Sequence, residues 1–325
     1  MEIQIIKCHG SGNDFIMIDE INQKLEFSED QRIKLTKALC NRNSILGADG
    51  VLFVLKSSKA DAMMRMFNPD GSEAEMCGNG LRCAGRLVTD LLGKVQAQVE
   101  TMKAVLEVKK VQDIYKDIKT YQVQISPISL ELDSLPMKFG NATTVIDETI
   151  ESLSKDLTFT AVSVPNPHLV TIVEEYDEET FKTIAEKANS DRSLFPNGVN
   201  VSFVKQLGNA SIFVLTYERG VGFTNACGTA MSASTFVTCL LDINKINSVI
   251  DVYNKGGMVQ CVVNEDHMGP HSISLIGNAT YTFTSTIELD FANPDQFKQL
   301  HKKECQDEVA KYAELEAYIK SKFEL

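Results

Sequence analysis

The chain has 325 residues, of which 43% are hydrophobic and 23% are charged. A chain of this length and composition is long enough for two domains with their own cores and too apolar to remain disordered. Its 44 acidic residues outnumber its 32 basic ones, which gives a formal net charge of -12, and no lysine and arginine cluster offsets this charge. We therefore expect an ordinary globular protein that does not bind nucleic acid.

The first residues do not have the pattern of a secretion signal. MEIQIIKCHG lacks a basic leader followed by an apolar stretch, and the aliphatic run at 51–55 is far too short to span a bilayer. The eight cysteines are spread along the chain with no CxxC pair, which is typical of thiols in a reducing compartment. We therefore expect a cytoplasmic protein with no membrane partner.

Hydrophobic periodicity divides the first half into strands and helices. Ser28 and Gln31 form a capping box at the start of one helix. Apolar positions from Leu81 to Leu92 have helical spacing and predict a helix that begins at or just after Cys77 and stops at Gly93. The elements expected here are strands at 3–7 and 15–18, a helix to about 39, strands at 50–55 and 62–67, the helix after Cys77, and strand-like segments from 96 to about 128.

The second half repeats this order. At an offset of 150 residues, FNPDGSEAEMCGNGLRCAGRLVTDLL aligns with YERGVGFTNACGTAMSASTFVTCLLD, and in both an aromatic strand end lies ten residues before a Cys-Gly pair. We interpret this as an internal duplication in which two similar domains each place one cysteine at a helix N-terminus. The elements expected here are strands at 159–164 and 169–173, a helix at about 178–188, strands at 199–204 and 212–217, and a helix opened by Cys227.

Two of the cysteines are placed for chemistry. A thiol in the first turn of a helix faces unpaired backbone N–H groups and the positive end of the helix dipole, so its pKa can fall below the free value of about 8.5. Cys77 and Cys227 have this position, and the glycines that follow them let backbone amides approach an anion. The other cysteines are expected to pack as small hydrophobic residues: Cys8, Cys40, Cys83, Cys239, Cys261 and Cys305.

Two thiols on opposite sides of one tetrahedral carbon can invert it. One removes a proton as thiolate while the other delivers a proton as thiol, and each must lie within reach of its proton. The duplication supplies one cysteine for each side, which predicts an amino-acid racemase or epimerase that moves one α-proton between Cys77 and Cys227.

The motifs HGSGNDF, MFNPDGSEAEMCGNG, VPNPHLV, FPNGVNV and YERGVGFTNACGT occur in this order and resemble the diaminopimelate epimerase family as far as about Leu289. The resemblance implies an α/β fold of two pseudo-symmetric half-domains, each with strands wrapped around a central helix, and an active site in the cleft between them. It also implies interconversion of LL- and meso-2,6-diaminopimelate, for lysine and peptidoglycan precursor synthesis, without pyridoxal phosphate, metal or other cofactor. The only partners expected are this substrate and a second copy of the chain in a homodimer.

Site residues follow from the resemblance by motif position. Cys77 and Cys227 would be the acid and base, bordered by His168 and Glu218. The reacting carboxylate would be surrounded by Gly78, Asn79, Gly228 and Thr229. The rest of the substrate would be held by Asn13, Asn68, Asn166, Asn200, Glu218 and Arg219.

Several of these residues have simpler interpretations. Asn68 before Pro69 suits a plain turn, and His168 after Pro167 suits a hydrogen-bonded structural histidine. Arg219 beside Glu218 suits a surface ion pair, but its place just before Gly220 also suits a bidentate clamp on a carboxylate. We favour the clamp.

The expected domains are 1–135 with Cys77, 136–278 with Cys227, and 279–325, in which a strand near 282–289 returns to the first domain and a helical tail follows. Asn293 and Pro294 suit the start of the tail helix. Its apolar stripe would consist of Phe297, Leu300, Val309, Tyr312, Leu315, Ile319 and Phe323.

Four positions depart from the family pattern and bear on the shape of the pocket: Phe223, Ala230, Pro165 and Gly50. His267 and His271 do not predict a metal site, because HMGPH cannot form one helical face and has only Asp266 as a nearby ligand.

Other functions remain open from the sequence. The chain could be a racemase of histidine or proline type on the same fold, or an isomerase with a carboxylate in place of one thiol, although two retained cysteines argue against the isomerase. A redox sensor would not need the asparagine and arginine set. A catalytically inactive binding module would be expected to lack a cysteine.

Overall fold

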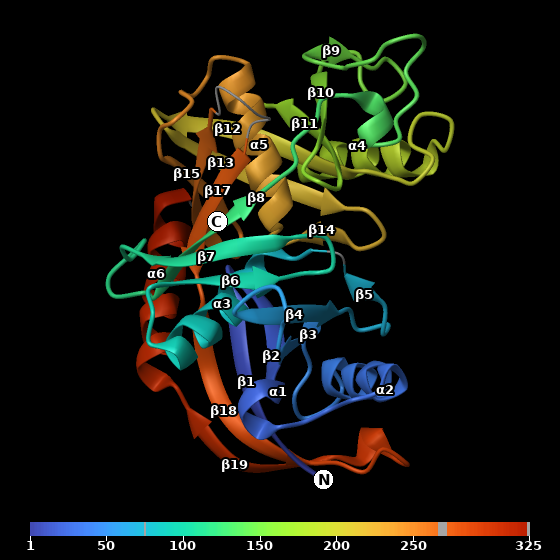
Figure 1. The fold of residues 1–325 in the computed structure, drawn as a ribbon. Coiled ribbons are helices and arrows are strands. Elements are labelled where there is room, and N and C mark those ends of the chain that lie inside the picture. The colour runs from blue at the N-terminus through green and yellow to red at the C-terminus, as the bar shows by residue number, and fades with distance from the viewer. Residues whose placement is uncertain (75, 266–271, 324–325) are drawn as a thin grey trace. The chain divides into compact units, whose positions relative to one another are not determined.

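The computed structural model describes residues 1–74, 76–265 and 272–323, and its fold is mixed α/β, as expected (Figure 1). The chain forms two compact units. Unit 1 comprises Met1–Val123 with the described residues from Ile276 onward, and unit 2 comprises Gln124–Leu275. Within the described ranges, no helix is both long and apolar enough to cross a membrane.

Unit 1 is built around helix α3 (Gly78–Leu92), which packs against β1, β4, β6 and β7. The helix is buried on all sides from Gly78 to Thr89. Gly85 permits this packing, because a Cβ there would lie 2.2 Å from Val108 on β7. The remaining elements are β1 (Glu2–Gly10), β2 (Asn13–Asp19), α1 (Glu20–Gln23), α2 (Glu29–Cys40), β3 (Gly50–Leu55), β4 (Ala62–Phe67), β5 (Glu73–Ala74), β6 (Gln96–Glu100), β7 (Val105–Val111), β18 (Thr280–Glu288), β19 (Lys298–Glu304) and α6 (Gln306–Phe323).

Unit 2 is built around helix α5 (Gly228–Leu240), which packs against β11, β12, β13 and β16. This helix consists mostly of small and apolar residues, nearly all of them buried. The remaining elements are the 3₁₀ helix η1 (Leu132–Ser134), β9 (Glu148–Thr149), β10 (Thr158–Ser163), β11 (Pro167–Ile172), α4 (Glu178–Ser190), β12 (Asn200–Gly208), β13 (Ser211–Glu218), β14 (Gly222–Thr224), β15 (Ile250–Asn254) and β16 (Gly257–Asn264). Two further strands, β8 (Thr120–Ile125) and β17 (Ser272–Asn278), span the points where the chain passes between the units.

The two units have the same topology. In unit 1, β2 pairs parallel with β3, and β3 pairs antiparallel with β4. Strand β4 then pairs antiparallel with β5 and parallel with β6. In unit 2, β11 pairs parallel with β12, and β12 pairs antiparallel with β13. Strand β13 then pairs antiparallel with β14 and parallel with β15. The starts of β3 at Gly50 and β12 at Asn200, and of α3 at Gly78 and α5 at Gly228, keep the 150-residue offset of the sequence motifs. This repetition supports the predicted duplication.

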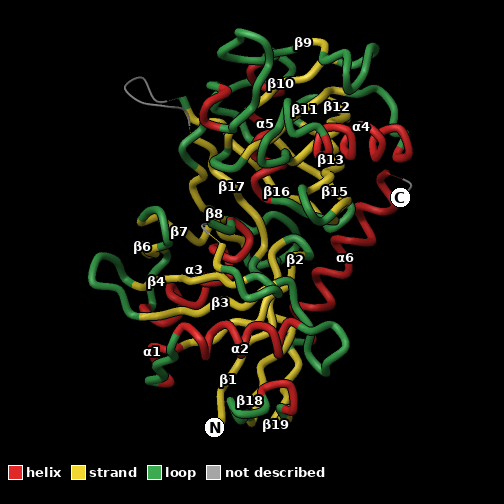
Figure 2. Tube along the Cα trace, turned by 90° about the vertical axis from the view of Figure 1, so that its right-hand side faces the viewer, coloured by secondary structure: helices red, strands yellow, loops and turns green. Residues whose placement is uncertain are grey.

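The C-terminal segment differs from the prediction. Asn293 and Pro294 do begin a helix, but it is the short 3₁₀ helix η2 (Pro294–Gln296). The long helix begins at Gln306, because residues 298–304 form β19, which pairs antiparallel with β18. Strands β1, β18 and β19 therefore lie side by side (Figure 2). Phe297 and Leu300 belong to this strand region and not to a helical stripe. The helix itself is packed as expected, since Tyr312, Leu315 and Ile319 are buried against unit 1.

Candidate active site

Cys77 is the N-cap residue of α3, and Gly93 ends the helix in the left-handed conformation with a φ of 63°, both as predicted. The thiol Sγ accepts a hydrogen bond from Gly80 N at 3.4 Å. Asn13, at the start of β2, reaches the same place because Ser11 and Gly12 turn the chain with positive φ. Its Oδ1 lies 4.0 Å from Cys77 Sγ and accepts a hydrogen bond from Asn79 Nδ2 at 3.3 Å. The structure thus brings together Asn13, Cys77 and Asn79.

Asn68 lies in the turn between β4 and β5. Its backbone N–H donates to Ser72 O at 2.8 Å and its side-chain amide donates to Ser72 Oγ at 3.1 Å. These are the bonds of a turn residue, and within the described part of the chain no hydrogen bond joins Asn68 to Asn13, Cys77 or Asn79.

Sequence patterns do not single out two charged residues beside this cluster. Arg82 donates to Asn79 Oδ1 at 3.0 Å, and Asp49 accepts from Asn13 Nδ2 at 2.8 Å. For Arg82, one signal was available. It is a charged residue among the apolar and small residues of α3, and these residues are buried. For Asp49, no local signal exists, because its partner is 36 positions away.

In unit 2, Cys227 is the N-cap residue of α5. Its Sγ lies 3.5 Å from Thr229 Oγ1, and, besides burial, the negative charge of the Glu218 carboxylate raises the pKa of its thiol. Glu218 also accepts a hydrogen bond from Thr224 Oγ1 at 2.6 Å. The predicted neighbours Glu218 and Thr229 therefore lie beside this cysteine.

The other predicted residues of unit 2 lie at one end of three adjacent strands. His168 on β11 pairs with Asn200 on β12, and β13 ends beside them at Glu218. The Oδ1 atom of Asn166 lies 2.8 Å from His168 Nε2. Arg219 is anchored by its backbone N–H, which donates to Asn200 Oδ1 at 3.0 Å, and its guanidinium donates to Asn197 O at 3.2 Å.

Burial governs the acidity of the site. It raises the pKa of the Cys77 thiol to about 11, although the amide of Gly80 and the charge of Arg82 lower it. Burial raises the pKa of Cys227 further, and the negative charge of Glu218 adds to this rise. The expectation of lowered thiol pKa values is therefore wrong, because desolvation of the thiolate outweighs the helix N-terminus.

His168 is neutral at physiological pH. The side chain has no solvent exposure, and burial together with the positive charge of Arg219 lowers its pKa to about 3. It is therefore available for hydrogen bonding but not as a cation.

The four departures from the family pattern have structural settings. At Gly50 a Cβ would lie 2.7 Å from Met66 Cε and 2.8 Å from Phe67 O, so this position excludes any side chain as the strands stand. Phe223 packs on Tyr217 with ring centroids 5.3 Å apart, Ala230 is buried, and Pro165 O accepts from Ser163 Oγ. Asp266, His267 and His271 lie outside the described residues.

Comparison with known proteins gives a consistent result. The family model described as diaminopimelate epimerase matches residues 5–123 and 160–282. A diaminopimelate epimerase of Clostridium acetobutylicum is 46% identical over 91% of this chain and 89% of its own length. One from Listeria monocytogenes is 45% identical over 98% of this chain and 97% of its own.

Solved structures of low sequence identity share the fold. A phenazine biosynthesis protein of the PhzF family from Bacillus anthracis matches with a TM-score of 0.63 at 15% identity, over 89% of this chain and 100% of that chain. A hydroxyproline epimerase from Agrobacterium vitis matches with a TM-score of 0.60 at 14% identity, over 89% of this chain and 92% of that chain.

Proposed function

The chain belongs to the diaminopimelate epimerase family and is an isomerase, and we propose that Cys77 and Cys227 carry out its reaction as a pair of acid and base. The reaction interconverts LL- and meso-2,6-diaminopimelate. The observation that carries the proposal is the repeated topology, which puts one cysteine at the N-cap of the central helix in each of two similar units.

In the proposed mechanism, the thiolate of one cysteine takes the α-proton while the thiol of the other delivers a proton to the opposite face of the carbon. This mechanism requires that both half-domains contact the substrate. Negative charge develops on the reacting carboxylate and α-carbon. The first amides of α3 and α5, at Gly78, Asn79, Gly228 and Thr229, would stabilise this charge, because helix N-termini present unpaired N–H groups and positive potential.

The second amino-acid group of diaminopimelate needs a different environment. In our proposal the guanidinium of Arg219 binds the distal carboxylate, while oxygens of Asn166, Asn200 and Glu218 accept hydrogen bonds from the distal ammonium. Their position on adjacent strand ends of unit 2 supports this set. Asn68 would act from unit 1, and His168 would border the thiols as a neutral group.

The acid and base work rests on the two thiols alone, so we propose that the reaction needs neither pyridoxal phosphate nor a metal. All eight cysteines are free, which supports a cytoplasmic location, since thiols persist in a reducing compartment. We further propose that the protein is a homodimer. Light scattering on the purified protein would measure its mass.

The test is incorporation of deuterium from D2O into the α-position of LL-diaminopimelate, followed together with formation of the meso isomer. Cys77→Ala and Cys227→Ala should each abolish epimerisation, since one base cannot serve both faces of the carbon. Cys83→Ala and Cys239→Ala are matched controls, because these buried cysteines lie in the same two helices, and they should retain activity. Near-normal turnover by either N-cap variant would refute the two-thiol mechanism.

A further inference from the structure

Arg82 is a fully buried cation on the helix that begins at Cys77. Its Nε donates to the backbone carbonyl of Asn278 at 3.1 Å, and its Nη2 donates to Ser11 Oγ at 3.2 Å and to Asn79 Oδ1 at 3.0 Å. Burying a guanidinium costs free energy unless its donors are satisfied. The side chain is therefore held in one place by partners from three segments of unit 1.

This placement determines how the Asn79 amide is oriented. An asparagine amide has a donor end and an acceptor end of nearly equal shape, so its neighbours decide which end points where. A guanidinium has only donors, so it requires the oxygen of Asn79. The Asn79 nitrogen then faces Asn13 and donates to its Oδ1 at 3.3 Å.

Asp49 fixes the other end of this series of hydrogen-bonded side chains. An ionised carboxylate only accepts hydrogen bonds, and Asp49 Oδ2 accepts from Asn13 Nδ2 at 2.8 Å. The oxygen of Asn13 must therefore face the other way, toward Asn79 and toward Cys77 Sγ at 4.0 Å. We call Arg82, Asn79, Asn13 and Asp49 the amide chain. Its donor direction is set by a cation at one end and an anion at the other.

We propose that Arg82 and Asp49 are positioning residues for the epimerisation, which fix the two asparagine amides so that the carbonyl of Asn13 faces the Cys77 thiol. This inference rests on the proposed function, in which Cys77 moves the α-proton and the amide of Asn79 stabilises the reacting carboxylate, and on the role in substrate binding that the family motif implies for Asn13. Cys83 and Arg82 both act on the Cys77 thiol. Burial raises its pKa and Cys83 raises it further, whereas Arg82 lowers it. Loss of Arg82 should thus leave Cys77 harder to ionise.

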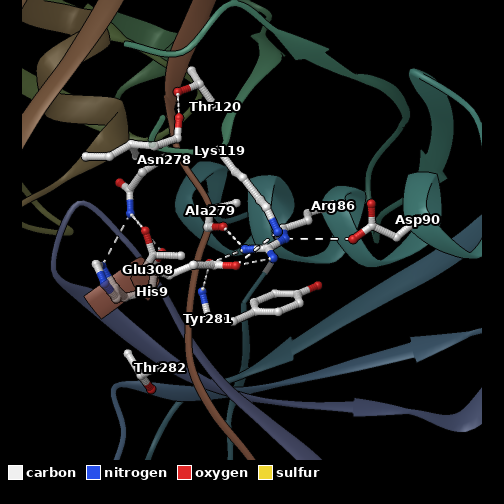
Figure 3. Close-up of polar contacts among 12 residues, drawn as sticks. His9, Arg86, Asp90, Lys119, Thr120, Asn278, Ala279, Tyr281, Thr282 and Glu308 are labelled. Atoms are coloured by element: carbon white, nitrogen blue, oxygen red, sulfur yellow. Dashed lines mark hydrogen bonds and ion pairs between the residues drawn. The ribbon is translucent and has the colours of Figure 1, made fainter. Parts of the chain in front are cut away.

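Helix α3 also provides a matched control. Arg86, one turn after Arg82, is similarly buried, but its guanidinium bonds to Glu308 and to the carbonyl of Ala279 (Figure 3). Its partners lie outside the amide chain. Removing Arg86 should destabilise unit 1 and leave the reactivity of Cys77 unchanged. Removing Arg82 should destabilise unit 1 and also change the reactivity of Cys77.

The experiment compares wild type with Arg82→Met, Arg82→Lys and Arg86→Met. Each protein is treated with iodoacetamide at pH 8.5, and the alkylation rates of Cys77 and Cys227 are measured in the same sample by peptide mass spectrometry. Each rise of one pKa unit removes about nine-tenths of the thiolate but makes the remainder about threefold more nucleophilic, so the rate falls about threefold per unit. Epimerisation kinetics are measured in parallel.

Arg82→Met should lower the ratio of Cys77 to Cys227 alkylation by about threefold or more and kcat/KM by at least about tenfold. Arg82→Lys should restore the alkylation ratio, because the charge remains. It should not restore kcat/KM, because a point charge cannot hold Ser11 and Asn79 in the geometry of a planar fork. Arg86→Met should melt at a lower temperature with an unchanged ratio. Wild-type kcat/KM in Arg82→Met or in Arg82→Lys, or an equal fall of kcat/KM in Arg86→Met, would overturn the proposal.

If Arg82→Met does not fold, Asp49→Asn tests the other end of the amide chain. The Asp49 side chain is 44% exposed, so this variant should fold. Asp49 accepts from Asn13 Nδ2, from the backbone N–H of Asp14 and from Arg42, and an amide at position 49 has only one oxygen for these three donors. Asn13 therefore loses its fixed acceptor, and kcat/KM should fall about tenfold with little change in melting temperature. Wild-type kcat/KM in this variant would overturn the proposal. A wild type that fails to epimerise diaminopimelate would instead refute the proposed function, and the alkylation ratios would still report on Arg82.

Discussion

The guanidinium of Arg86 on α3 and the carboxylate of Glu308 on α6 are joined by two hydrogen bonds of 2.6 and 2.7 Å. The Arg86 side chain is 3% exposed and that of Glu308 is 22% exposed. Glu308 also accepts from the backbone N–H of Tyr281 at 2.9 Å and from Lys119 Nζ at 3.0 Å (Figure 3). The C-terminal helix is thereby tied to the helix that carries Cys77.

Glu308→Ala should lower the free energy of unfolding by about 2 to 4 kcal/mol, because it leaves the charge of Arg86 buried without its carboxylate and the Tyr281 N–H without its acceptor. Urea unfolding at pH 7 measures this change. Glu314→Ala is the control on the same helix, since Glu314 is 58% exposed and lies 3.5 Å from an exposed lysine. It should leave the unfolding midpoint unchanged. Equal midpoints for the two variants would show that the Arg86 ion pair contributes nothing.

Acid should weaken the fold through the same carboxylate. Burial alone would raise the pKa of Glu308, but its hydrogen bond and ion pair with Arg86 outweigh burial and lower the pKa from 4.5 to about 2. A carboxyl group with a depressed folded-state pKa stabilises the fold above its unfolded pKa, and this contribution is lost as the pH falls through the folded pKa. Between pH 5 and 2, Glu308→Gln should therefore lose stability with a shallower slope than wild type. Parallel slopes in urea unfolding would contradict this.

Thiol reactivity gives a third prediction. In the ligand-free enzyme at pH 8, both Cys77 and Cys227 should react with iodoacetamide more slowly than free cysteine, because burial raises both thiol pKa values. Cys77 should react faster than Cys227, since the charge of Glu218 further disfavours the Cys227 thiolate. Glu218→Gln should accelerate alkylation of Cys227 and leave that of Cys77 unchanged. Faster reaction of Cys227 in the wild type would contradict the assigned role of Glu218.

Local chemistry explains which elements could be predicted from the sequence. The capping box of Ser28 and Gln31 is present as expected, and α3 begins after Cys77 and ends at Gly93, because caps depend on residues within one helical turn. The strands at 50–55 and 62–67 have the predicted bounds. Such signals lie within short windows of sequence.

Non-local contacts explain what could not be predicted. Residues 298–304 pair with β18, and nothing within that segment distinguishes it from the start of the following helix. Arg82 depends on the carbonyl of Asn278, which is 196 positions away. The direction of the thiol pKa shifts depends on burial, which results from the tertiary fold, whereas helix position alone suggested the opposite sign.

The last prediction concerns recognition of the distal carboxylate. Arg219 follows the end of β13, and its backbone N–H is fixed by Asn200 Oδ1 at 3.0 Å. One guanidinium nitrogen donates to Asn197 O at 3.2 Å. An arginine presents five N–H donors in a plane, which matches a carboxylate bidentately, whereas lysine presents a point charge. Proline, histidine and alanine have no distal carboxylate for such a clamp to bind.

Arg219→Lys should therefore lower kcat/KM for LL-diaminopimelate by about 10- to 100-fold, the effect of losing about 1.5 to 3 kcal/mol of charge-assisted hydrogen bonding. Arg192→Lys is the matched control, because Arg192 is exposed and flanks the same Gly198 turn, where its Nη1 lies 3.6 Å from a Cβ built on that glycine. It should retain wild-type kinetics. If kcat/KM of Arg219→Lys stays within about twofold of the wild-type value, Arg219 does not bind the distal carboxylate. If the wild type racemises proline, histidine or alanine faster than it epimerises diaminopimelate, the substrate assignment is wrong while the two-cysteine mechanism stands.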